Sequence, residues 1–166
     1  MREILFRGKR LDNGEWVDGG SIFRLINKIG EHFFIPQFGE RLIATHDDNM
    51  MNIVALENMT MYRVDPETVG QYTGLRDCKR TAEYPEGQMI FEGDVIKVER
   101  DLHCGENKKE REIFNGVVWY DDKHTCFGIK SKKYRCLPIH RFKGDYSAII
   151  GNIHDNPELL KEGGEE

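Results

Sequence analysis

Closely spaced turn residues constrain the fold of this chain more than any other feature of its sequence. The 166 residues include 17 glycines against five prolines, which predicts many turns between short segments. An Asn13-Gly14 pair between apolar flanks is the strongest short-range hairpin signal, because both positions of its tight turn favour a positive φ. We therefore expect antiparallel strands near residues 2–9 and 15–19.

Short segments with strand-like patterns continue along the chain. A second hairpin is expected from residues 21–27 and 31–36, and further strands are expected at 42–45, 61–64, 94–98, 112–120, 125–129, 134–138 and 148–153. Asn156 can cap a helix and Pro157 suits its first position, which predicts one short helix near residues 156–161. The predicted fold class is therefore mostly β, with short antiparallel strands and a short C-terminal helix.

The composition places the chain among globular proteins. Apolar residues make up 39% and charged residues 32%, a balance that excludes a disordered chain. The sequence contains no apolar run near the ~20 residues of a membrane span, and its first residues do not form a signal peptide. We therefore expect a cytoplasmic protein without a membrane partner. Its four cysteines, Cys78, Cys104, Cys126 and Cys136, are expected to be reduced thiols.

Three stretches of the sequence form a recognisable set: REILFRGKR at 2–10 with GEWV at 14–17, GQYTGLRD at 70–77 followed by IFEGDV at 90–95, and IIGNIHDNPELL at 149–160. Together they resemble the YopX family of small bacteriophage and prophage proteins. The resemblance implies one YopX-like unit over residues 1–166, or a division into an N-terminal β region, 1–70, and an SH3-like small barrel, 71–166. It implies a phage-derived source and supplies no catalytic residues. The segment 78–88 is longer than the turn that usually joins these central pieces in the family.

The charge is most uneven between residues 123 and 144, which carry a formal charge of +7 in a chain of net charge −5. Lysine and arginine bind phosphates, so this segment is a candidate nucleic-acid surface. Aromatic residues lie among these cations, and Tyr134 could stack on a base. The opposing interpretation is a solvated hairpin whose aromatic rings face the core. The candidate nucleic-acid-binding residues are Lys130, Lys132, Lys133, Arg135, Arg141 and Lys143.

Two other sets of residues contain metal-ligand chemistry. His103-Cys104, His124-x-Cys126 and Cys136-x3-His140 offer zinc ligand types, but the spacing is not that of repeated Cys-x-x-Cys pairs. His46-Asp47-Asp48 and Asp121-Asp122 could hold magnesium, although both sets also suit plain turns. The sequence therefore favours Cys126 and Cys136 as small buried apolar residues, with no metal, no cofactor and no catalytic residues.

These observations favour a non-enzymatic protein that works by binding. Its partner could be nucleic acid, a phage or host protein, or further copies of the chain. A small β protein with exposed strand edges either protects them or pairs them, which favours a homo-oligomer. The alternative is a small metal-dependent enzyme that processes nucleic acid through its acidic clusters.

Overall fold

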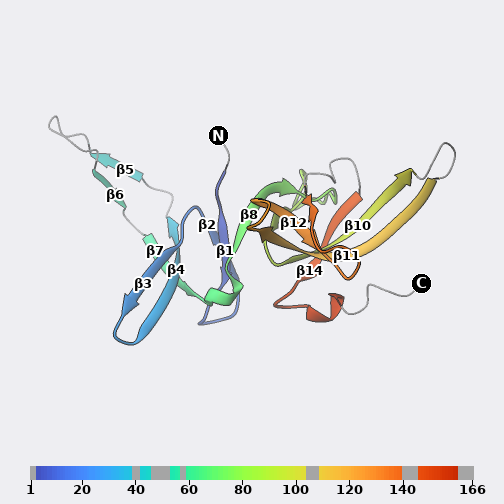
Figure 1. Cartoon of the computed structure of the whole chain (residues 1–166). Helices are drawn as coiled ribbons and strands as arrows, with labels where there is room; N and C mark the ends of the chain where they lie inside the picture. Colours follow the sequence, from blue (N-terminus) through green and yellow to red (C-terminus); the bar gives the residue numbers. More distant parts are fainter. Residues whose placement is uncertain are drawn as a thin grey trace. The chain divides into compact units, whose positions relative to one another are not determined.

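The chain is mostly β, as its sequence predicts. The computed structural model describes residues 3–38, 42–45, 53–56, 59–103, 109–139 and 146–160. Strands make up 57% of the chain and helical turns 7%. The fold divides into two compact units, Ile4–Val69 and a second that begins at Gly70, and each has a hydrophobic core of its own (Figure 1). No helix among the described residues is long and apolar enough to cross a membrane.

The N-terminal unit consists of antiparallel hairpins. Its elements are β1 (Phe6–Lys9), β2 (Trp16–Gly19), β3 (Phe23–Asn27), β4 (Gly30–Phe38), β5 (Leu42–Thr45), β6 (Ile53–Leu56), β7 (Met59–Val64) and the 3₁₀ turn η1 (Pro66–Thr68). β1 pairs with β2 and β5 pairs with β6, while β3, β4 and β7 form a three-stranded sheet in that order. Val17, Ile35 and Val64 are buried at the centre of this unit.

The Asn-Gly turn differs from the predicted type. Gly14 has a positive φ of 74°, but Asn13 does not. The side chain of Asn13 instead accepts a hydrogen bond from the backbone of Glu15 at 3.0 Å, and the Gly14 N–H donates to the carbonyl of Arg10 at 3.0 Å. A longer loop that ends in one left-handed glycine therefore closes the hairpin, and only one positive φ is needed.

The C-terminal unit is built around one five-stranded antiparallel sheet. Its strands are β8 (Gly70–Arg76), β9 (Met89–Phe91), β10 (Asp94–His103), β11 (Lys109–Asp121), β12 (Cys126–Lys130), β13 (Leu137–Pro138) and β14 (Tyr146–Asn152). β8 pairs with β9, and the five-stranded sheet has the order β13-β12-β11-β10-β14. Together the antiparallel strands form a half-barrel. Its core consists of Ile90, Ile96, Val98, Phe114, Val118, Phe127, Ile129 and Ile139.

Two of the sequence stretches that suggested the family meet inside this unit. Asp94, at the end of the IFEGDV stretch, is buried, and its carboxylate accepts a hydrogen bond from the Phe91 N–H at 2.7 Å. Asn152, in the IIGN stretch, donates from its side chain to the other oxygen of Asp94 at 3.4 Å. A buried carboxylate needs such donors, so these distant positions are linked by one hydrogen-bond network.

The predicted C-terminal α-helix is not formed among the described residues. The chain instead makes one 3₁₀ turn, η3 (Pro157–Leu160), closed by a hydrogen bond from the Leu159 N–H to the Asn156 carbonyl at 3.2 Å. The Asn156 side chain accepts from the Asn152 N–H at 3.4 Å. It points back to the preceding strand instead of capping the next turn, and a segment this short has too few internal hydrogen bonds to sustain an α-helix.

Candidate functional site

The predicted cations lie on a turn instead of a continuous strand. Lys130 ends β12, and the following residues form a turn in which the Ser131 N–H donates to the Tyr134 carbonyl at 2.8 Å. Lys130, Lys132, Lys133 and Arg135 are all exposed. Arg141 and Lys143 lie outside the described residues. Strand alternation therefore does not decide which way these side chains point.

One of these cations is held by a carboxylate. Glu112 on β11 accepts hydrogen bonds from Arg100 at 2.7 Å, from the Tyr134 hydroxyl at 2.6 Å and from the Lys133 ammonium. Burial raises the pKa of Glu112, but these three donors outweigh it and lower the pKa to about 2. Lys133 is therefore paired within the fold, and the other exposed cations of this turn are Lys130, Lys132 and Arg135.

The side chain of Tyr134 also makes contacts within the fold. Its ring lies 5.2 Å from that of Phe114 between centroids, and the residue is half-buried. Because its hydroxyl donates to Glu112, the ring is fixed on the sheet. Base stacking by Tyr134 stays a prediction, and it would have to use a ring that already packs on Phe114.

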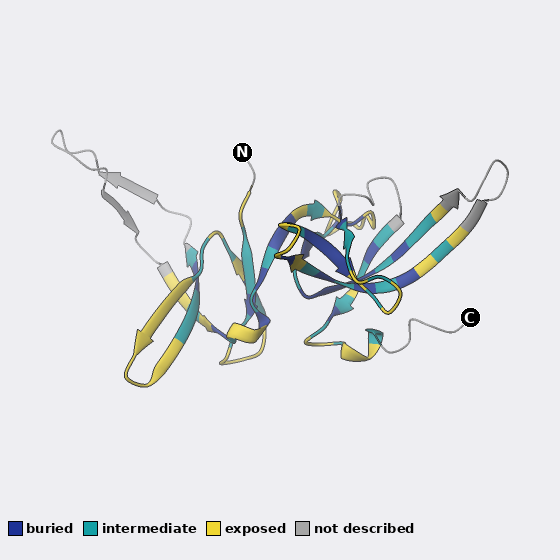
Figure 2. Cartoon of the chain, in the orientation of Figure 1, coloured by how far each residue is buried: buried dark blue, intermediate teal, exposed yellow. Residues whose placement is uncertain are grey.

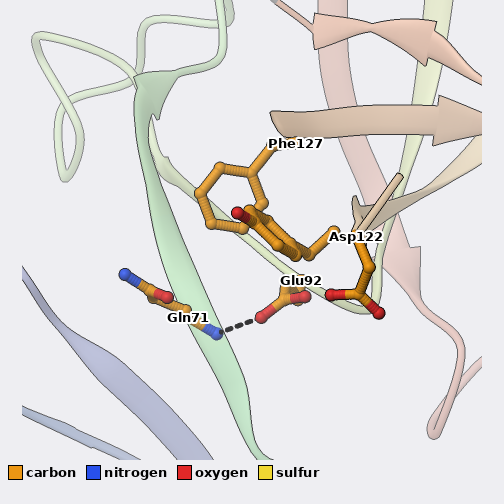
Figure 3. A pocket seen from close by; sticks show the side chains of 5 residues that line it. Gln71, Glu92, Asp122 and Phe127 are labelled. Atoms are coloured by element: carbon orange, nitrogen blue, oxygen red, sulfur yellow. Dashed lines mark hydrogen bonds between the residues drawn. The ribbon is translucent and has the colours of Figure 1, made fainter. Parts of the chain in front are cut away.

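An open pocket of about 490 Å³ lies elsewhere on the C-terminal unit. Its lining residues are Gln71, Glu92, Tyr120, Asp122 and Phe127. Figure 3 shows the carboxylates of Glu92 and Asp122 beside the aromatic rings, and Glu92 accepts from the Gln71 N–H at 3.0 Å. The rings of Tyr120 and Phe127 meet edge to face at 5.2 Å. Two carboxylates would repel a phosphate, so this pocket does not extend the basic surface and suits a cationic group instead.

Asp121, His124 and Cys136 form a cluster of possible metal ligands. One ligand atom from each residue lies within 4.8 Å of the others. The Nδ1 of His124 donates to Asp121 at 2.6 Å, and this bond, with that to Cys136, lowers the pKa of Asp121 to about 2. Burial and the neighbouring Asp121 raise the pKa of the Cys136 thiol to about 11. These three residues are the described ones that could hold a metal ion.

This cluster joins residues that the sequence analysis placed in different sets. Asp121 was grouped with Asp122, but Asp121 is buried against His124, whereas Asp122 is exposed and lines the pocket. The two carboxylates therefore do not form one magnesium site. The remaining candidates, His46, Asp47, Asp48, Cys104 and His140, lie outside the described residues, and the side chain of His103 is not described.

The edge strand β3 carries a feature that the sequence analysis missed. All five of its residues are exposed, as Figure 2 shows in yellow. The exposed apolar side chains of β3 are those of Phe23, Leu25 and Ile26, and Ile29 in the adjoining turn is exposed as well. Among the described residues, β3 pairs only with β4, so its other edge carries unpaired backbone groups. The sequence signal was present, because apolar residues at successive positions of a strand point to both of its faces.

Comparison with known proteins identifies the family. The YopX protein family model matches residues 5–161, nearly the whole chain. The chain belongs to the YopX family. The resemblance inferred from the three sequence stretches is therefore confirmed.

One solved structure shares the fold. It is the crystal structure of protein EF1440 from Enterococcus faecalis, which matches with a TM-score of 0.50 and 18% sequence identity. The match covers 95% of this YopX-family chain and 97% of the other. At this identity the likeness concerns the fold alone. Among curated protein sequences, none matches the chain significantly.

Proposed function

We propose that this YopX-family chain is a non-enzymatic binding and assembly protein that pairs with a second copy of itself through β3. The observation that carries the proposal is the exposed apolar edge strand. Soluble proteins usually protect such an edge with charges, prolines or bulges, or cover it with a partner. β3 has one charged residue, Arg24, and that side chain forms an ion pair with Glu31 of its own hairpin.

A second copy fits this edge without opposing like charges. Antiparallel pairing about a two-fold axis at Leu25 places the two Leu25 side chains opposite each other. It also places Arg24 opposite Ile26 of the second copy, so the two arginines do not face one another. In this register the two Leu25 side chains form the apolar pair at the axis, while Phe23 lies opposite Asn27 and Ile26 opposite Arg24. The same strand surface thus serves both copies, as a symmetric interface requires.

The expected affinity is modest. Each favourable cross-strand pair contributes ~0.2–1 kcal/mol, and the backbone ladder adds to this. A single short strand then supports a dimer that dissociates in the micromolar range. Dimerisation should accordingly depend on concentration over the range that light scattering covers.

The test is a charge placed at the proposed axis. Leu25→Lys sets two ammonium groups opposite each other, and Leu25 is 53% exposed, so the fold should tolerate the change. Ile113→Lys on β11 is a matched control, because Ile113 is 52% exposed. Light scattering across micromolar concentrations should show a dimer for the wild type and for Ile113→Lys, and a monomer for Leu25→Lys. A monomeric wild type, or a dimer that Leu25→Lys leaves intact, would refute the proposal.

The predictions from the sequence about the barrel type, the source and the cellular location of the chain are part of the same proposal. We propose that the half-barrel of the C-terminal unit is a variant of the SH3-like barrel, and that the chain comes from a phage or prophage and acts in the cytoplasm. Family membership and the antiparallel sheet are consistent with these statements.

Nucleic acid is a second candidate partner. The supporting observation is the exposure of Lys130, Lys132 and Arg135 around one turn. The ammonium of Lys130 lies 5.6 Å from the centre of the Trp119 ring, so this cation is positioned on the sheet. Such a small group of cations favours weak contact with phosphates over sequence-specific recognition.

A further inference from the structure

We propose that Asp121, His124 and Cys136 bind a divalent metal ion of the zinc class. The inference is independent of the proposed self-pairing, because it rests on the C-terminal unit alone. It joins Asp121, which the sequence analysis weighed as a magnesium ligand or a turn residue, to His124 and Cys136, which it weighed as zinc ligand types.

Sheet register brings the ligands together. Asp121 is the last residue of β11 and pairs with Cys126, the first residue of β12. His124 lies in the turn between these strands, and its ring reaches back to Asp121 at 2.6 Å. Zinc bonds of ~2.0–2.3 Å place tetrahedral ligands roughly 3.5 Å apart, so ligand atoms within 4.8 Å of one another are already close to that arrangement. Cys126 is not part of this group, so the fourth position is left to a water molecule.

A glycine makes room for the third ligand. The sulfur of Cys136 lies 2.7 Å from the position that a Cβ on Gly128 would occupy. Gly128 is two residues from Cys126 on β12, and both positions therefore face the same side of the sheet. Any side chain at 128 would displace the thiol from Asp121 and His124. The absence of a side chain thus forms a cradle for the Cys136 sulfur.

The indole N–H of Trp119 supports a Cys136 thiolate above Gly128. The indole nitrogen of Trp119 is buried and makes no hydrogen bond within normal geometry. Trp119 is the cross-strand partner of Gly128, over which the Cys136 sulfur lies. Metal-bound thiolates accept hydrogen bonds of this kind from the surrounding shell, which tune the site. A metal-bound Cys136 thiolate would give the Trp119 N–H an acceptor.

The turn between the strands is strained where it presents His124. Thr125 has a φ of 51°, and a β-branched residue rarely adopts this left-handed conformation. Strain of this kind persists when surrounding contacts hold it, and it occurs often at binding sites. In this turn the residue before Thr125, His124, contacts Asp121 through its ring nitrogen at 2.6 Å.

The donor set selects the class of metal. A carboxylate, an imidazole and a thiolate together suit zinc and neighbouring transition metals, whereas magnesium and calcium prefer oxygen ligands only. A bound ion would tie Cys136 to the β11–β12 hairpin. Since Lys132, Lys133 and Arg135 shortly precede Cys136 in the chain, it would also fix the turn that carries these cations.

The test is a cobalt titration of the full chain with a thiol-free reductant present. Co²⁺ reports on zinc sites through a thiolate charge-transfer band and through intense visible bands when coordination is tetrahedral. We expect one cobalt per chain, displaced by zinc. Cys136→Ser should abolish the charge-transfer band, and His124→Ala should weaken binding by more than about 100-fold.

The control is Cys78→Ser, which removes an exposed thiol from a loop outside the cluster and should leave the titration unchanged. Circular dichroism of the metal-free variants separates loss of a ligand from loss of the fold. A wild type without the charge-transfer band would overturn the proposal. A band that persists in folded Cys136→Ser protein, or that disappears in Cys78→Ser, would overturn it equally.

Discussion

Glu112 shows how one residue determines the character of the surface around it. Three donors from two segments, β10 and the turn after β12, converge on its carboxylate, so a lysine that the sequence counted as free is bound within the fold. The same contacts keep Glu112 ionised far below the usual pKa of a carboxyl group. This residue therefore links the stability of the C-terminal unit to pH and reduces its basic surface.

Glu112→Gln should lower the free energy of unfolding by about 2 kcal/mol at neutral pH, because the amide cannot satisfy three charged or polar donors. The folded-state pKa of about 2 lies below the ordinary value of 4.5. The carboxylate's contribution is thus complete above pH 4.5 and is lost as the pH falls toward 2. Urea unfolding at several pH values measures this. The exposed Glu15→Gln should change stability by less than ~0.5 kcal/mol. An equal deficit of Glu112→Gln near pH 2 and at neutral pH would contradict the account.

A substitution at Thr125 should raise the free energy of unfolding, whereas Glu112→Gln should lower it. Asparagine tolerates a left-handed backbone better than a β-branched residue does, so Thr125→Asn should relieve strain. We expect the free energy of unfolding of the metal-free chain to rise by about 0.5–1 kcal/mol. Thermal unfolding of the two proteins checks this, and a lower melting temperature for the variant would show that Thr125 is not strained.

At the scale of elements, polar residues were the main obstacle to sequence prediction. The sequence between residues 101 and 111 suits a charged loop or a hairpin tip. The structure has the hairpin, in which β10 extends to His103 and β11 begins at Lys109. Arg100 lies opposite Glu112, and Asp101 lies opposite Arg111. Opposite charges across a ladder stabilise a strand pair that has little apolar content. The second hairpin, by contrast, was predicted at 21–27 and 31–36 and forms at Phe23–Asn27 and Gly30–Phe38, because both strands are rich in apolar residues and Gly30 marks the turn.

The candidate sites could be predicted only in part. Sequence identified the cations near residue 130, but it could not show that Glu112 binds Lys133. It also listed Asp121, His124 and Cys136 without grouping them. Their proximity depends on the register of β11 with β12 and on the space above Gly128, and neither follows from spacing along the chain.

The turn after β12 allows a test of nucleic-acid binding. If all three exposed cations of this turn contact phosphates, the log–log dependence of affinity on salt should have a slope of about −3 for a duplex. Replacing Lys130, Lys132 and Arg135 by glutamine should flatten this slope, whereas Lys79→Gln with Arg80→Gln in an exposed loop should not. Fluorescence anisotropy with single- and double-stranded DNA and RNA measures both. No binding even at low salt would show that the turn is only a solvated surface.

At the scale of the whole molecule, the two units have different roles in this account. The C-terminal unit contains the larger core, the ligand cluster and the cations. The N-terminal unit contains the exposed apolar edge. A chain of net charge −5 gains little from general attraction to nucleic acid, so assembly through an apolar strand is the stronger proposal.

Amide hydrogen exchange of β3 at two protein concentrations tests that proposal most directly. In a single chain, alternate N–H groups of residues 23–27 point away from β4 and should exchange rapidly. Pairing with a second copy gives these same groups acceptors. The account predicts that they become protected at high concentration, that dilution removes the protection, and that Leu25→Lys removes it at every concentration. Rapid exchange of these amides at concentrations where the chain is dimeric would contradict it, because the dimer would then form through another surface.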